Sequence, residues 1–142
     1  LDDGWFGKRD IDNCSLGDWV PDLRKLPNGI AGLSEKVHAE GLMFGIWVEP
    51  EMVSPDSDLY RAHPDWCLHV DGRARTLERN QLILDLSREE VQVYVRDAIC
   101  NVLKTGNVDY VKWDMNRNMT EYFSMALPPN LTTAMESAPY LR

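Results

Sequence analysis

Three polar clusters in this chain each follow an apolar run that is typical of a buried strand. They are Asp2 with Asp3, Trp47 with Glu49, and Lys112 with Asp114. Two helical patterns, over residues 29–40 and 88–104, separate the clusters. Alternating strands and helices predict an α/β fold in which parallel strands are joined by right-handed crossovers. Ligands in such folds lie at the C-terminal ends of the strands, so we expect the three clusters to share one site.

The apolar run that begins at Val108 predicts a strand, and several polar and charged side chains follow at its C-terminal end. Side chains alternate along a strand, so Lys112, Asp114 and Asn116 are expected on one face and Trp113 on the other. A cation, a carboxylate and an amide would then converge. We interpret Asp114 as a catalytic nucleophile that the charge of Lys112 keeps ionised. The alternative interpretation of this pair is a structural ion pair.

The two helices have recognisable ends in the sequence. Asn28 is a candidate N-cap for the first helix, and Gly41 is a C-terminal stop. Ser87 and Glu90 match a capping box ahead of the second helix, and Gly106 is expected to end it. The second helix should bury a stripe made of Val91, Val95, Ala98, Ile99, Val102 and Leu103.

The segments between the helices predict one more strand and two long connections. Residues 42–48 are expected to form a buried strand, and residues 8–28 an irregular connection. Within that connection Asp18 and Trp19 either line a site or pin the loop, and we favour the second interpretation. The excursion over residues 52–81 should contain a helical turn at residues 58–62 and a hairpin from residue 66 that turns at Asp71 and Gly72. Residues 128–142 show no clear period, and we leave them unassigned.

The charge balance argues against two classes of partner. The 142 residues carry 15 basic and 23 acidic side chains, a net charge of −8, whereas nucleic acids and anionic membranes require a basic surface. No apolar run is long enough to cross a bilayer. The three cysteines lie far apart without a CxxC pair, which argues against disulfides and a zinc site. Because the first residue is Leu1 rather than Met, we expect a fragment of a longer protein, cytoplasmic or alternatively secreted.

Four motifs occur in a fixed order along the chain. They are Asp2-Asp3-Gly4-Trp5-Phe6-Gly7-Lys8-Arg9, Leu16-Gly17-Asp18-Trp19, Trp47-Val48-Glu49-Pro50-Glu51-Met52-Val53 and Lys112-Trp113-Asp114-Met115-Asn116-Arg117. Their residues, order and approximate spacing resemble α-galactosidases of glycoside hydrolase family 36, over about residues 1–127. The resemblance implies a (β/α)8 TIM barrel, of which this chain would hold about three of the eight strands.

The resemblance also implies an activity and roles for individual residues. The activity would be hydrolysis of terminal α-D-galactosides, such as raffinose-type oligosaccharides and melibiose, with retention of configuration. Asp114 would be the nucleophile. The substrate-binding residues would be Asp2, Asp3, Trp47, Arg79, Lys112, Trp113 and Asn116. No metal or organic cofactor is expected, and full-length members of the family are often homo-oligomers.

One part of the catalytic device is missing from the sequence. A retaining glycosidase needs a second carboxyl group, the acid/base, roughly 5–5.5 Å from the nucleophile. In the family this group lies on a later strand, and the family pattern does not support Glu49 or Glu51 in its place. The chain alone is therefore expected to be inactive. Two alternatives stay open: a galactosyl transferase of the raffinose- or stachyose-synthase type, and a catalytically dead sugar-binding remnant.

Overall fold

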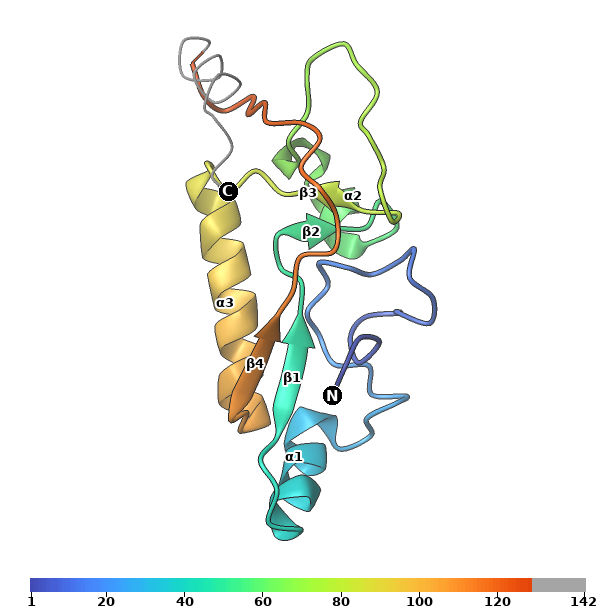
Figure 1. The fold of residues 1–142 in the computed structure, drawn as a ribbon, viewed down its shortest axis with the longest axis vertical. Coiled ribbons are helices and arrows are strands. Elements are labelled where there is room, and N and C mark those ends of the chain that lie inside the picture. Colours follow the sequence, from blue (N-terminus) through green and yellow to red (C-terminus); the bar gives the residue numbers. More distant parts are fainter. Residues whose placement is uncertain (129–142) are drawn as a thin grey trace.

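The computed structural model describes residues 1–128, so nearly all of the unassigned tail lies outside the described residues. The elements, in chain order, are α1 (Gly29–Ala39), β1 (Gly45–Val48), β2 (Met52–Val53), α2 (Asp58–Ala62), the 3-10 turn η1 (Pro64–Trp66), β3 (Leu82–Ile83), α3 (Glu89–Gly106) and β4 (Tyr110–Trp113). Figure 1 shows β1 and β4 side by side, with α3 running along the pair and the small β2–β3 pair beyond their C-terminal ends.

The predicted strand ends lie next to one another in one parallel sheet. β1 and β4 pair in parallel, with Trp47 opposite Lys112. Leu1 extends the sheet on the other side of β1, because its amino group donates to the Gly45 carbonyl at 2.7 Å and its carbonyl accepts the Trp47 N–H at 2.9 Å. This alternation is the bonding pattern of a parallel ladder. Two of the three polar clusters therefore follow paired strand ends, as the sequence predicts, and the first follows a residue that hydrogen-bonds to β1.

The main hydrophobic core lies where the sheet meets α1 and α3. The predicted stripe of α3 is confirmed, since Val91, Val95, Ile99 and Val102 are buried. The two helices approach closely at Gly106, where a Cβ atom would lie 2.7 Å from Cγ2 of Ile30. No helix among the described residues is long and apolar enough to span a membrane.

The helix caps differ from the sequence prediction. Arg88 occupies the N-cap position of α3, and the Ser87 hydroxyl instead donates to Asp85 at 2.6 Å. The capping-box prediction is wrong because the buried Asp85 carboxylate competes for that hydroxyl. Asn28 is the N-cap residue of α1, as predicted, but its side chain makes no capping hydrogen bond. Gly106 is the last residue of α3, and Asn107 follows it in the left-handed conformation.

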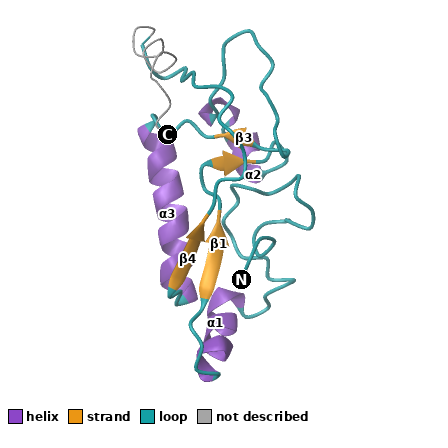
Figure 2. Cartoon of the chain, in the orientation of Figure 1, coloured by secondary structure: helices purple, strands orange, loops and turns teal. Residues whose placement is uncertain are grey.

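The strand and the long excursion after it are also only partly as predicted. β1 starts at Gly45 rather than at residue 42, because Leu42 and Met43 are exposed. The helical turn at residues 58–62 is confirmed as α2. The predicted hairpin is only partly confirmed. Residues 67–68 run antiparallel to residues 83–84, and the Arg73 N–H closes a turn around Asp71 and Gly72 by donating to the Val70 carbonyl at 3.2 Å. No strand follows that turn directly, and β3 pairs with β2. Residues 70–81 have no strand, and Figure 2 shows this part of the chain as a long loop.

Candidate active site

Asp114 lies directly after β4, with its carboxylate turned towards β1. Its N–H continues the parallel ladder by donating to the Val48 carbonyl at 2.8 Å, which fixes the backbone at this point. Oδ2 accepts the indole N–H of Trp47 at 2.9 Å and the side-chain amide of Asn116 at 3.0 Å. Oδ1 accepts the backbone N–H of Met115 at 3.1 Å. The predicted convergence of side chains at this strand end is therefore present.

These donors hold the pKa of Asp114 at about 2, below its ordinary value of 3.8. The Trp47 indole is the largest cause, and the Asn116 amide comes next. Lys112 acts in the predicted direction but contributes little, because its ammonium lies 3.5 Å away on a largely exposed side chain. The sequence predicted the charge of Lys112 as a cause, and the structure adds a larger one, the partly buried hydrogen bond from Trp47.

Trp47 is itself held by other aromatic residues. Its side chain is buried, and its ring lies parallel to that of Phe6, with centroids 6.3 Å apart. The Trp5 indole donates to the Trp47 carbonyl at 3.0 Å, and Trp19 packs against the same ring at 6.4 Å. Trp5 and Phe6, from the motif that begins at Asp2, thus hold Trp47 in the position from which it contacts Asp114. Sequence reasoning counted Trp47 among the substrate-binding residues and missed its role as a hydrogen-bond donor to Asp114.

The two adjacent carboxylates near the N-terminus have different surroundings. Asp3 accepts hydrogen bonds from the guanidinium of Arg9 at 2.9 and 3.0 Å, so a buried cation neutralises one of the two charges. Asp2 is exposed and lines a hollow of about 260 Å³ together with Trp47 and Lys112. The structure therefore brings three of the predicted substrate-binding residues to one concave surface, and two of them, Trp47 and Lys112, also contact Asp114.

Two predicted residues lie apart from this group. Trp113 faces the other side of β4, where its indole donates to Glu51 at 2.8 Å. Arg79 is exposed within the turn from Glu78 to Gln81, in the left-handed conformation. Its guanidinium makes no hydrogen bond or ion pair with the described part of the chain. Neither side chain contacts Asp114 in this structure.

Sequence reasoning gave no chemical role to three buried polar residues close to Asp114. Glu49, Gln81 and Arg117 are all at least 96% buried. Glu49 accepts the backbone N–H of Asn116 and, at 3.1 Å, the side-chain amide of Gln81. Arg117 donates to the Gln81 carbonyl. The sequence already placed Glu49 in a polar cluster after an apolar run. The signal for its role is that a charged residue in such a place is rarely buried without partners.

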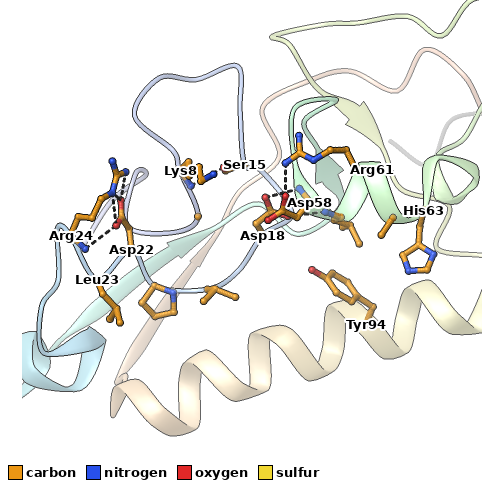
Figure 3. Close-up of a pocket in the computed structure, with 15 residues that line it drawn as sticks. Lys8, Ser15, Asp18, Asp22, Leu23, Arg24, Asp58, Arg61, His63 and Tyr94 are labelled. Atoms are coloured by element: carbon orange, nitrogen blue, oxygen red, sulfur yellow. Dashed lines mark hydrogen bonds and ion pairs between the residues drawn. The ribbon is translucent and has the colours of Figure 1, made fainter.

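A cavity larger than the hollow beside Asp2 lies elsewhere in the described chain. It measures about 620 Å³ and lies among the N-terminal connection, α2 and α3. Figure 3 shows Asp18 pointing at the start of α2, where its carboxylate accepts the N–H groups of Asp58 and Leu59 at 3.0 and 2.9 Å. This confirms that Asp18 pins the connection, and burial raises the pKa of its carboxyl. None of the predicted site residues lines this cavity, so the polar strand ends remain the candidate site.

Residues 1–128 contain no group of three His, Cys, Asp or Glu side chains that could hold a metal ion. Cys14, Cys67 and Cys100 are free thiols. The side chains around Asp114 offer one ionised carboxylate, N–H donors that hold it, an exposed ammonium and a second carboxylate. That combination suits a polyhydroxylated ligand with an electrophilic carbon.

Comparison with known proteins points to a single family. The melibiase family model matches residues 1–140. The α-galactosidase AgaA of Geobacillus stearothermophilus is 64% identical over 129 residues, which are 91% of this chain and 18% of that protein. The α-galactosidase Mel36A of Lactobacillus acidophilus is 48% identical over 128 residues, 90% of this chain and 18% of that protein. The chain thus spans less than a fifth of the length of these curated relatives.

Solved structures agree with the sequence matches. A crystal structure of GH36 α-galactosidase AgaA in complex with raffinose superposes with a TM-score of 0.92 at 60% identity, over 96% of this chain and 19% of that one. The α-galactosidase from Lactobacillus brevis gives a TM-score of 0.92 at 49% identity, over 96% and 18% of the two chains. The chain therefore belongs to the melibiase family and is similar throughout its described length to GH36 α-galactosidases.

Proposed function

We propose that this chain supplies the nucleophile of a retaining α-galactosidase that hydrolyses terminal α-D-galactosides such as raffinose-type oligosaccharides and melibiose. The observation that carries the proposal is the ionised Asp114 carboxylate, which Trp47 and Asn116 hold. Trp47 also lines a hollow together with Asp2 and Lys112. The relatives support it, because they are named α-galactosidases and structures of AgaA contain raffinose or stachyose.

The hydrogen bonds of Asp114 suggest which oxygen attacks. Oδ2 holds two side-chain donors, whereas Oδ1 accepts only the N–H of Met115. Oδ1 has the freer lone pair and would attack the anomeric carbon, while the glycosidic oxygen leaves with a proton from the acid/base. Water would then cleave the galactosyl ester, with its proton returned to that same group. Two inversions at the anomeric carbon retain the α configuration.

The remaining predicted residues offer groups that match a galactose ring. Asp2 and Lys112 face the hollow as an acceptor and a donor for hydroxyl groups, and the outer edge of the Asp3 carboxylate is available for another. Arg79 presents its guanidinium within its turn, and Trp113 keeps an exposed ring. In this proposal both reach the substrate from the rim, whereas Asp114 and Asn116 act at its reacting centre.

We infer that Leu1, β1 and β4 represent three neighbouring strands of a (β/α)8 TIM barrel, with residues 1–127 as part of its catalytic domain. The parallel order and the helices α1 and α3 on the connections support this topology. In this proposal the acid/base lies on a later strand, and the whole enzyme is a cytoplasmic homo-oligomer without a metal or organic cofactor.

A chimera makes the proposal testable. Residues 1–128 replace the segment they match in the Geobacillus stearothermophilus α-galactosidase, which supplies the remainder of the enzyme. A fluorinated galactosyl inhibitor that traps the covalent intermediate is added, and the labelled peptide is identified by mass spectrometry. Label on Asp114 is expected, and label on any other carboxylate rejects the assignment. Product analysis with and without sucrose as acceptor separates hydrolysis from galactosyl transfer.

A further inference from the structure

We infer that Glu49 is a positioning residue, whose carboxylate holds the backbone of the nucleophile segment and the turn that carries Arg79 in one fixed geometry. The inference rests on the proposed function, because it concerns the orientation of the proposed nucleophile. Glu49 lies one residue beyond β1 and is 99% buried. A carboxylate in such a place is normally held by several donors, and here the donors come from two separate parts of the chain.

One oxygen of Glu49 acts on the nucleophile segment. Oε1 accepts the backbone N–H of Asn116, two residues after Asp114. The Asn116 side chain in turn donates to Oδ2 of Asp114 at 3.0 Å. The buried carboxylate thereby fixes the point from which the Asn116 amide reaches the nucleophile. A shift of this backbone would change both the direction of the Asp114 carboxylate and the donors that keep it ionised.

The other oxygen acts on the turn that contains Arg79. Oε2 accepts the side-chain amide of Gln81 at 3.1 Å. The N–H of Gln81 closes a four-residue turn by donating to the Glu78 carbonyl at 3.0 Å. The two central residues, Arg79 and Asn80, have φ angles of 53° and 59°, which non-glycine residues rarely adopt. Such a turn persists only where its surroundings stabilise it. The hydrogen bond between Glu49 and Gln81 is one of the contacts that stabilise it.

Arg117 reinforces the same connection from the nucleophile segment. Its guanidinium donates to the backbone carbonyls of Gln81 and, at 3.1 Å, of Thr76. The turn is thus attached to residues 116–117 by two routes, one through Glu49 and one through Arg117. Within residues 1–128, Glu49 is the side chain that contacts both the backbone of Asn116 and the turn, so its length contributes to the separation of the two.

Two substitutions of Glu49 can separate the effect of its side-chain length from the effect of its charge. Glu49→Asp keeps the charge but withdraws both acceptor oxygens by one methylene group. Glu49→Gln keeps the length and one acceptor oxygen for Asn116. Oε1 of Gln81 is buried without a partner among the described residues. If the side-chain amide of Gln81 rotates by 180°, this oxygen can accept a hydrogen bond from the new amide at position 49. A positioning residue should therefore tolerate the second substitution better than the first.

The test uses the chimera with p-nitrophenyl α-galactoside, and measures kcat, KM and the pH profile of kcat/KM. We expect Glu49→Asp to lower kcat by up to about 100-fold, as misplacement of a reacting group by about 1 Å does. The acid limb should move to higher pH, because the Asn116 amide no longer supports the charge of Asp114. Lys112 is the charged side chain in contact with Asp114 within residues 1–128, and it is unchanged. Glu49→Gln should leave kcat and the acid limb close to those of the unsubstituted chimera.

Two further variants separate positioning from general stability. Asp85 is as deeply buried and binds Ser87 and Ser124, with no hydrogen bond to residues 114–117. Asp85→Glu is therefore the matched one-methylene change, and it should lower the melting temperature without moving the acid limb. Gln81→Met removes the hydrogen bond between the turn and Oε2 of Glu49 but keeps the Asn116 contact of Oε1. It should therefore raise KM through Arg79 and leave the acid limb in place.

Three outcomes would overturn the inference. Glu49→Asp could resemble Asp85→Glu, with a lower melting temperature and an unchanged acid limb. Glu49→Gln could be the more damaging of the two Glu49 variants, which would mean that the charge matters and the length does not. Gln81→Met could leave KM unchanged. Failure of the unsubstituted chimera to be labelled at Asp114 would instead reject the proposed function itself.

Discussion

The indole nitrogen of Trp47 and Oδ2 of Asp114 lie 2.9 Å apart, so one hydrogen bond joins the ends of two neighbouring parallel strands. Trp47 is opposite Lys112 in the register, and Asp114 is the next residue on the same face of β4. The long indole can span this offset, whereas a shorter side chain on β1 could not. This contact is the main reason that the pKa of Asp114 lies at about 2.

Trp47→Phe is therefore expected to raise the pKa of Asp114, because phenylalanine keeps an aromatic ring but has no N–H to donate. A carboxylate with a higher pKa becomes protonated at higher pH, so the acid limb of kcat/KM should move upward in the chimera. Trp66→Phe is the control, since Trp66 stacks on His63 away from the strand ends. An acid limb that does not move in Trp47→Phe would show that the indole is not the main support of the charge.

The face and the neighbours of the site could be predicted because they follow from local patterns. Alternation along a strand places Lys112, Asp114 and Asn116 together, and the order of strands and helices places Asp2 and Trp47 beside them. Each step needs only the sequence near one strand end. The same logic predicted α2 and the buried stripe of α3.

Contacts between distant segments could not be predicted in this way. Glu49 meets Asn116, and Trp47 meets Asp114, across 67 residues in each case. Which donor reaches which oxygen depends on strand register and side-chain length. Neither of these appears in the periodic pattern of apolar residues along the sequence. The capping box failed for a similar reason, because Ser87 has a buried carboxylate as a competing partner. Local preferences are weak where a buried charge requires donors.

The lowered pKa of Asp114 also predicts a pH dependence of stability. A carboxyl group whose pKa is lowered in the folded state stabilises the fold above its ordinary pKa of 3.8, and this contribution is lost as pH falls towards about 2. The chimera should therefore melt at a higher temperature than its Asp114→Asn variant near neutral pH. The difference should shrink below about pH 4. A difference that stays constant down this range, by calorimetry, would contradict the assigned pKa.

Gly106→Ala is expected to destabilise the fold, although alanine usually favours a helix. The added Cβ atom would lie 2.7 Å from Cγ2 of Ile30, so α1 and α3 would have to move apart. We expect a loss of about 1–3 kcal/mol, as is typical for overpacking a core contact. Chemical denaturation of the chimera would measure it. Combining the change with Ile30→Ala should recover part of the loss, and additive effects would show that the two residues do not interact.

Removing the nucleophile should allow an external anion to take its place. Asp114→Ala is expected to lower the hydrolysis of p-nitrophenyl α-galactoside by a factor on the order of 10⁴, as loss of a catalytic carboxylate can. Azide is small enough to occupy the vacated space between Trp47 and Asn116, and it should restore release of nitrophenol. It would attack the anomeric carbon from the face that Asp114 occupied, so the product should be the inverted β-galactosyl azide. The coupling constant of the anomeric proton identifies this product.

Asp2→Ala is the control for this experiment, because it removes a proposed substrate contact without removing the nucleophile. It should also slow the reaction, but azide should not restore its rate. An α-configured azide, or equal rescue of both variants, would mean that Asp114 is not the attacking group.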